Sequence, residues 1–372
     1  MRFLSWILHL HWVLYLLAVC LGLLPAPQLA ATPNHFPFER RPIADGVYGF
    51  FETGTHPVVS GNIVAVIGRD AVLLFDAGHH PAMTRDIVAQ IKQLTPLPIR
   101  YLAISHWHDD HWLGAAEVAD AYPGVEVVAH PFTAKLIETR RDRISGEACR
   151  AIFERDSKAL REQLEAARGP NAHAVPEARR ARAESFLVDL DAAAAECAVA
   201  RYRGVDTTVS ASRTIDLGGR RVELRFLGRG NTAGDLIAIL PESRTILTGD
   251  LVVHPFPFAT QSYIPEWARV LRTLEEMAPA TIVPGHGPVM HDLGYVRTLA
   301  SLLESIDRQA RAAYHPGATL EELRPRINLA SFRETIAHGD PFIAANFDAM
   351  MDSAVDRMWQ ELAGQLKPEG LS

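Results

Sequence analysis

A cluster of metal-ligating side chains lies near residue 106, where His106, His108, Asp110 and His111 fall within six residues. In an extended chain, residues two apart point to the same side. His106 and His108 can therefore bind one ion, whereas Asp110 and His111, which follow a turn, can face a second ion. Imidazole and carboxylate ligands together favour zinc, with iron and manganese as alternatives. The competing interpretation is a polar loop whose histidines are merely exposed.

Three turns in the second half of the chain carry side chains of similar chemistry. Asp250 ends the run 248–250, His286 lies in the proline- and glycine-flanked run 284–288, and Asn231 lies in the run 230–235. Each run alone is typical of an ordinary turn. Because each follows a predicted strand, and all follow the 106–111 cluster in order, together they indicate one site.

This arrangement of motifs, over about residues 43–292, resembles the metallo-β-lactamase superfamily, in particular its glyoxalase-II-like and lactonase-like branch. The resemblance implies a site for two zinc ions, with iron or manganese as alternatives. The first ion would be held by His106 and His108, and the second by Asp110, His111 and His286. Asp250 would be shared between the two ions.

Asn231 departs from the family pattern, because it stands where the resemblance implies a third histidine ligand for the first ion. An asparagine carbonyl binds zinc or iron more weakly than imidazole does. We therefore expect the first site to be weak, distorted or open to an extra water. Asp235 or His254 could compensate by folding inward. His79 and His80 could also approach the site, although surface histidines are the preferred interpretation of both.

The function that this pattern implies is hydrolysis. Two metal ions lower the pKa of bound water toward neutrality, so a metal-bound hydroxide would cleave an ester, lactone, thioester or amide bond of a small molecule. Asp110 would also relay the proton to the leaving group. Asp250 argues against a β-lactam specialist, because the β-lactamases of this family usually lack that acid. The apolar residues after it, 254–263, could line an acyl pocket or belong to the core.

Two other functions fit the same residues. Some relatives hold iron and act as oxidoreductases on sulfur compounds or oxygen. A non-catalytic metal-binding protein is the other alternative, in which Asn231 marks decay of the site. Retention of the other six ligand positions argues against decay.

The elements that position these residues are predicted as short apolar strands alternating with amphipathic helices. The order indicates two similar halves, each with strands and a covering helix, and the resemblance implies an α+β fold, the four-layer αββα sandwich. Residues 32–42 are expected to be a polar leader before the first strand, and residues 207–211 are predicted as a strand. In the turn at residues 76–78, Asp76 is either a brace for the metal loop or simply a turn residue.

Two helical additions are predicted around the sandwich. Residues 131–206, rich in alanine, arginine and glutamate, indicate a helical insertion with a break at 169–171, which is either a solvated decoration or a lid over the site. The sandwich itself is assigned to residues 32–300. Residues 301–372 form a helical extension that could pack on the domain, cover the pocket or make a dimer, so the oligomeric state stays open.

The N-terminus predicts export. Residues 1–31 have a positive start, a long apolar run and small residues near 30, which is typical of a secretory signal peptide and of a periplasmic or secreted protein. An uncleaved membrane anchor is the alternative, since the apolar run is long enough to span a bilayer. Cys149 and Cys197 could then form a disulfide or remain buried thiols.

Charge argues against one class of partner. The net charge is −7 and the basic residues are scattered along the chain. A nucleic-acid-binding surface needs clustered lysine and arginine, so no nucleic-acid partner is expected.

Overall fold

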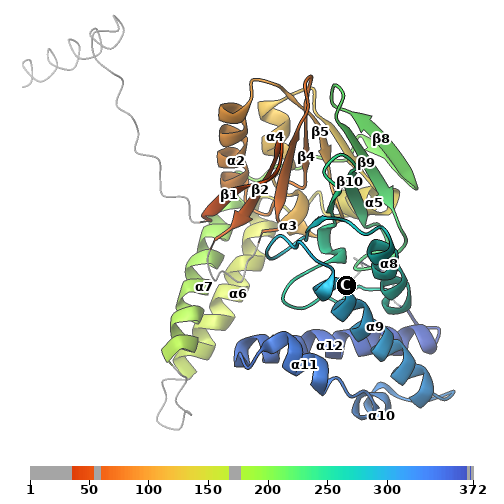
Figure 1. The fold of residues 1–372 in the computed structure, drawn as a ribbon. Coiled ribbons are helices and arrows are strands. Elements are labelled where there is room, and N and C mark those ends of the chain that lie inside the picture. The colour runs from red at the N-terminus through yellow and green to blue at the C-terminus, as the bar shows by residue number, and fades with distance from the viewer. Residues whose placement is uncertain (1–35, 54–59, 167–176, 367–368, 370–372) are drawn as a thin grey trace, which may run out of the picture. The chain divides into compact units, whose positions relative to one another are not determined.

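The computed structural model describes residues 36–53, 60–166, 177–366 and 369. Residues Phe36–Ser372 form one compact unit (Figure 1). The predicted signal peptide, residues 1–31, lies outside the described residues and stays a prediction. Among the helices that the structure describes, none has both the length and the apolar character needed to cross a membrane.

The first sheet has seven strands in sequential order. Strands β1 to β4 pair antiparallel, and β4 to β7 pair parallel. The strands are β1 (Phe38–Ala44), β2 (Val47–Glu52), β3 (Ile63–Ile67), β4 (Val72–Phe75), β5 (Ile99–Ala103), β6 (Glu126–Ala129) and β7 (Thr207–Thr208).

The second sheet has five strands in the order β12-β11-β10-β9-β8. Its strands are β8 (Ser212–Asp216), β9 (Arg221–Phe226), β10 (Leu236–Leu240), β11 (Thr245–Leu247) and β12 (Thr281–Val283). Strands β11 and β12 are parallel, whereas the other neighbours are antiparallel.

The two sheets pack face to face, because side chains along each strand point alternately to the two faces of its sheet. In β4, Leu73 and Phe75 join the apolar cluster between the sheets, whereas Val72 and Leu74 point to the outer cluster, as a period of two requires. The outer face of the first sheet is covered by α2 (Pro81–Leu94) and α4 (Ala115–Ala121). The outer face of the second sheet is covered by α8 (Ile264–Glu276) and α9 (Gly294–Ala313). The predicted αββα sandwich is therefore confirmed.

The helices outside the sandwich fall in the two places predicted to be helical. Between β6 and β7 lie α5 (Pro131–Thr139), α6 (Gly146–Ala166) and α7 (Glu177–Glu196). After α9 come α10 (Leu320–Leu323), α11 (Ala330–Ala337) and α12 (Pro341–Leu362), and α12 packs into the same apolar cluster as α8 and α9. The predicted break at 169–171 lies outside the described residues. The domain boundaries and the role of the insertion as a lid stay predictions.

Two sequence predictions about strands are wrong. Residues 38–42, the last part of the expected leader, belong to β1. This is an edge strand whose exposed Arg40, Arg41 and Pro42 hide the usual alternation, and proline is tolerated at a sheet edge. Of residues 207–211, only Thr207 and Thr208 are strand. The chain then crosses to the other sheet, where β8 forms the hairpin with β9.

The open question about the cysteines is answered by a disulfide between Cys149 of α6 and Cys197 just after α7. It joins the base of the two-helix hairpin and closes a loop with a sequence separation of 48 residues. The hairpin reaches the sandwich next to α2, where the Glu196 carboxylate accepts a hydrogen bond from the Ala82 N–H at 2.8 Å.

Replacing Cys149 by serine is expected to lower the free energy of unfolding by about 2–4 kcal/mol, because the crosslink restricts the unfolded chain. Denaturant unfolding under non-reducing conditions measures the loss. The Cys149→Ser/Cys197→Ser double variant should lose no more than the single variant, and reductant should bring the wild type to the same value. Two titratable thiols in the denatured, unreduced protein would contradict the disulfide.

Candidate metal centre

The predicted ligands converge at one edge of the sandwich, where strands of both sheets end. His106 and His108 follow β5, Asp110 and His111 lie in the short helix α3 (Asp109–Trp112), Asp250 lies in a 3₁₀ turn (Gly249–Leu251) after β11, and His286 follows β12. Two groups of side chains have ligand atoms close enough to hold an ion: His106, His108 and Asp250, and Asp110, His111 and His286. These are the two groups expected from the sequence.

In the first group, His106 and Asp250 are buried and His108 is half-buried. His106 Nε2 lies 2.8 Å from His108 Nδ1 and 3.6 Å from Asp250 Oδ2. His106 is fully buried and Asp250 is 4% exposed. Two imidazole nitrogens at this distance repel each other if both present lone pairs, so a cation or a proton must lie between them.

The second group surrounds His111 Nε2. Asp110 Oδ2 lies 3.3 Å from it, Asp250 Oδ1 3.2 Å, and His286 Nε2 3.3 Å. His286 Nε2 lies 2.9 Å from Asp110 Oδ2. Asp250 thus directs one carboxylate oxygen to each group, as a bridging ligand would. Asp110 is 22% exposed and His286 is 16% exposed, so solvent reaches this group through both side chains.

The electrostatics of the two groups differ. Burial disfavours protonation of His106 and His108 and lowers both pKa values. Burial acts in the same way on His111 and His286, but the charges of Asp110 and Asp250 outweigh it and raise both pKa values. Burial raises the pKa of Asp110 and Asp250, yet the facing histidines outweigh it and hold both below the ordinary value. The first group therefore offers neutral imidazoles, and the second holds protons that a metal would replace.

The fully buried carboxylate of Asp76 supports histidines of both groups. Of the two interpretations of this residue, the structure therefore favours a brace for the metal loop over a simple turn residue. Oδ1 accepts a hydrogen bond from the Ser105 N–H at 2.7 Å, and Oδ2 accepts one from the Ser105 hydroxyl at 2.8 Å. Oδ2 also lies 2.8 Å from His111 Nδ1, and Ser105 Oγ lies 3.0 Å from His106 Nδ1. Because these last two contacts use the Nδ1 atoms, the Nε2 atoms of His111 and His106 stay free to face a bound ion.

Asn231 is fully buried, and its Nδ2 donates a hydrogen bond to the Phe258 carbonyl. The Phe258 ring meets the His108 ring edge-on, with centroids 5.4 Å apart. Asn231 Oδ1 and Asp250 Oδ1 are buried and accept no hydrogen bond from the described residues. Buried polar atoms normally have a partner, so these two oxygens fit a metal site.

The side chains proposed as substitutes for a third histidine are engaged elsewhere. Both oxygens of Asp235 accept hydrogen bonds from the Thr232 N–H, and Oδ1 also accepts one from the Thr232 hydroxyl. His254 is exposed and packs against Tyr295. The interpretation of His80 as a surface residue is wrong, since it is 1% exposed and stacks on Phe36. Its neighbour His79 packs against Phe153 of α6.

Gly61 and Asn62, which carry no metal-site motif in the sequence, join the two halves of the site. The Gly61 N–H donates to the Asp110 carbonyl at 3.0 Å, and the Asn62 N–H donates to the Gly285 carbonyl at 2.7 Å. Asn62 Nδ2 also donates to the carbonyls of Pro284 and Gly287, both at 2.9 Å. A Cβ atom on Gly61 would lie 2.4 Å from the His111 ring, so glycine is required there.

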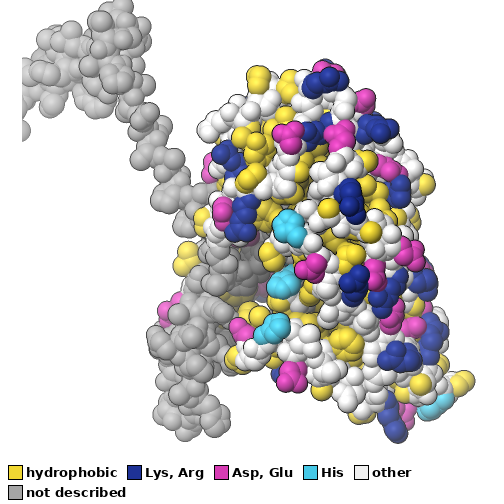
Figure 2. All heavy atoms as spheres, viewed as in Figure 1, with side chains coloured by type: hydrophobic (Ala, Val, Ile, Leu, Met, Phe, Trp, Pro, Cys, Tyr) yellow, Lys and Arg dark blue, Asp and Glu magenta, His cyan; other side chains and the backbone are white. Residues whose placement is uncertain are grey.

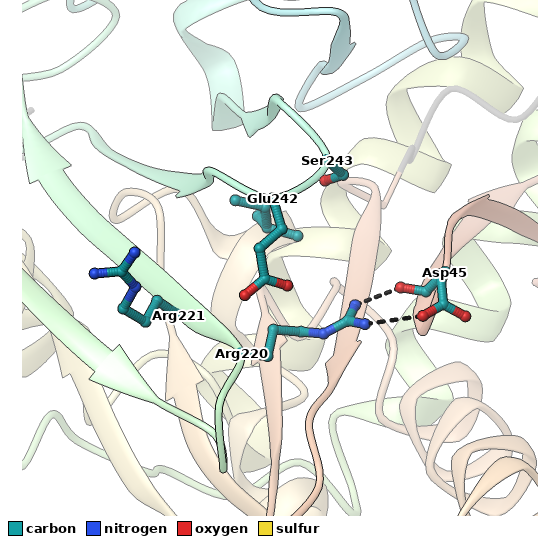
Figure 3. A pocket seen from close by; sticks show the side chains of 6 residues that line it. Asp45, Arg220, Arg221, Glu242 and Ser243 are labelled. Atoms are coloured by element: carbon teal, nitrogen blue, oxygen red, sulfur yellow. Dashed lines mark hydrogen bonds and ion pairs between the residues drawn. The ribbon is translucent and has the colours of Figure 1, made fainter.

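A pocket at the other end of the strands has different chemistry (Figure 3). It is lined by Asp45, Arg220, Arg221, Leu240, Glu242 and Ser243. Arg220 donates to the carbonyl and carboxylate of Asp45 and thereby ties the β8–β9 turn to the β1–β2 turn. On the molecular face drawn in Figure 2, basic and acidic side chains are interspersed, and histidines lie among hydrophobic and acidic groups.

Replacing Asp76 by alanine is expected to lower zinc affinity by about 10–100-fold, because loss of a brace behind ligating histidines has this effect. Competition with a chromogenic chelator measures the affinity. The Asp70→Ala variant, an exposed acid at the opposite end of β4, is the matched control. Equal affinities in the two folded variants would show that Asp76 does not support the site.

The chain resembles known proteins in sequence pattern and in fold. A family model described as "Metallo-beta-lactamase superfamily" matches residues 56–286. Similar solved structures include a metallo-beta-lactamase from Pontibacter korlensis, 20% identical, covering 72% of this chain and 99% of that one with a TM-score of 0.47. The DIM-1 metallo-beta-lactamase is 14% identical, with coverage of 72% and 98% and a TM-score of 0.50. At this identity the likeness to the DIM-1 structure shows a shared fold alone. No curated protein matches the chain.

Proposed function

Because the chain belongs to the metallo-beta-lactamase superfamily, we propose that it is an exported, zinc-dependent hydrolase of a small molecule with an ester, lactone, thioester or amide bond. The observation that carries the proposal is the pair of converging ligand groups with Asp250 between them. Histidine nitrogens and carboxylate oxygens are the donors that zinc takes in catalytic sites.

In the proposed site, the first ion would be held by His106, His108 and Asp250, with Asn231 as a further ligand. The second ion would be held by Asp110, His111 and His286, and Asp250 would be shared between the two. Zinc, when bound, lowers the pKa of a coordinated water and polarises the scissile carbonyl.

Asp110 is the acid that can act on substrate. It is 22% exposed, whereas Asp250 is 4% exposed, so only Asp110 combines access to the ligand group with access to solvent. We assign to Asp110 the transfer of a proton to the leaving group. General acid–base groups in such positions contribute about 10²–10⁴-fold to rate.

Export is supported by the Cys149–Cys197 disulfide, because disulfides persist in oxidising compartments. Together with the apolar N-terminal run this favours a periplasmic or secreted protein. A membrane attachment would require that the N-terminal segment stays uncleaved.

Elemental analysis of the purified mature protein tests the metal site. We expect two zinc ions per chain at saturating zinc, with the first bound more weakly than in the Asn231→His variant, because imidazole is the stronger ligand. One ion in the wild type and two in the variant would show that Asn231 does not complete a site. Iron in place of zinc would favour an oxidoreductase, and no metal in either protein would refute the proposal.

A panel of lactones, thioesters, aryl esters and amides tests the reaction. We expect hydrolysis of at least one class by the zinc-loaded protein, and a fall in kcat of about 10²–10⁴-fold in the Asp110→Asn variant at zinc concentrations that restore its metal content. The Asp109→Asn variant, which changes the neighbouring acid bound to Arg140, is the control. Full metal loading without hydrolysis of any class would leave a binding function in its place.

A further inference from the structure

The C-terminal extension reaches the metal centre through one buried arginine. Arg357 of α12 is 5% exposed. Its Nε donates a hydrogen bond to the Ser262 carbonyl at 3.0 Å, and its Nη2 donates one to the Gln261 carbonyl at 3.2 Å. A buried guanidinium bound to two backbone carbonyls fixes the position of that loop, because loss of either bond would take an acceptor away from a buried positive charge.

The side chain of Gln261 meets the metal ligand His108. Gln261 Oε1 lies 3.1 Å from His108 Nε2 and accepts a hydrogen bond from the Thr260 hydroxyl at 2.7 Å. A carbonyl oxygen only accepts hydrogen bonds, so the proton of His108 must lie on Nε2. The lone pair then lies on Nδ1, the atom that faces His106 Nε2 at 2.8 Å.

We propose that Gln261, held by Arg357, is a positioning residue that fixes the tautomer and ring orientation of His108 for a divalent metal ion at the first site. The inference rests on the proposed metal site and adds to it a residue from outside the ligand motifs. Partners behind a ligating histidine orient its ring and increase its basicity. At the first site this support offsets the weak ligand Asn231.

A second contact from the extension holds the same stretch of backbone. Trp107, between the two ligating histidines, donates its Nε1–H to Glu369 Oε2 at 2.8 Å. Glu369 is 2% exposed, and the Tyr263 hydroxyl and the Arg357 guanidinium also face its carboxylate. The extension therefore anchors both the loop that carries His108 and the loop that carries Gln261.

The test compares Gln261→Leu, which keeps the bulk and removes the acceptor, with Gln261→Glu, which keeps an acceptor oxygen. Gln93→Leu, an exposed glutamine on α2, is the matched control for the chemical change. Thermal unfolding and circular dichroism first establish that each variant folds. Ring-nitrogen NMR of the metal-free, ¹⁵N-histidine-labelled proteins then reports the protonated nitrogen of His108.

We expect the proton on Nε2 of His108 in the wild type and in Gln261→Glu, and a mixture of tautomers in Gln261→Leu. The first-site zinc affinity should fall by about 10–100-fold in Gln261→Leu and be restored to within about threefold of the wild type in Gln261→Glu.

Unchanged tautomer and affinity in the folded Gln261→Leu protein would overturn the inference. A changed KM with unchanged metal affinity would overturn it too, since Gln261 would then act on substrate. A wild type that binds no zinc would refute the proposed function instead, and the metal-free NMR spectrum would still decide the tautomer.

Discussion

The constraint on which the structure depends is the convergence of lone pairs in a buried site. His106, His108, His111 and His286 direct ring nitrogens toward one another or toward Asp110 and Asp250. Such an arrangement is unfavourable unless a cation or protons lie within it. The fold must therefore hold the ligands against their own repulsion, and the contacts around them do this. Asp76 and Ser105 brace two rings from behind, and Asn62 fastens the turn that carries His286.

The sandwich supplies this rigidity because the ligands follow strand ends instead of lying on long loops. Strands β4, β5, β11 and β12 end at the same edge, and the apolar cluster between the sheets fixes their relative positions. Glycine makes the close approach feasible. A Cβ atom on Gly285 would lie 2.0 Å from Asp250 Oδ1, so the shared carboxylate can occupy its place only beside a residue without a side chain.

Prediction from sequence succeeded where the evidence is local. The spacing of residues 106–111 and the turn after each strand are visible in short windows, and the sandwich followed from the family resemblance that these motifs carry. Prediction failed for contacts between residues that are far apart in the sequence. Nothing near Gln261 marks it as a neighbour of His108, 153 residues away, and Trp107 and Glu369 are 262 residues apart. The edge strand β1 was missed because exposed Arg40, Arg41 and Pro42 mask its alternation. His80 was misjudged because its burial depends on stacking with Phe36.

The two ligand groups of the centre are supported differently. At the second group, four ligand atoms converge with two carboxylates among them, so charge alone favours a cation. At the first group only Asp250 brings a charge, and Asn231 stands where the family resemblance implies a stronger histidine ligand. Because charge attracts a cation less strongly there, contacts from other residues must hold the ligands in position. The support comes from the C-terminal extension, through Arg357 and Gln261 to His108, and through Glu369 to Trp107. The proposed role of Gln261 thus gives the C-terminal helices a function beyond packing against α8 and α9.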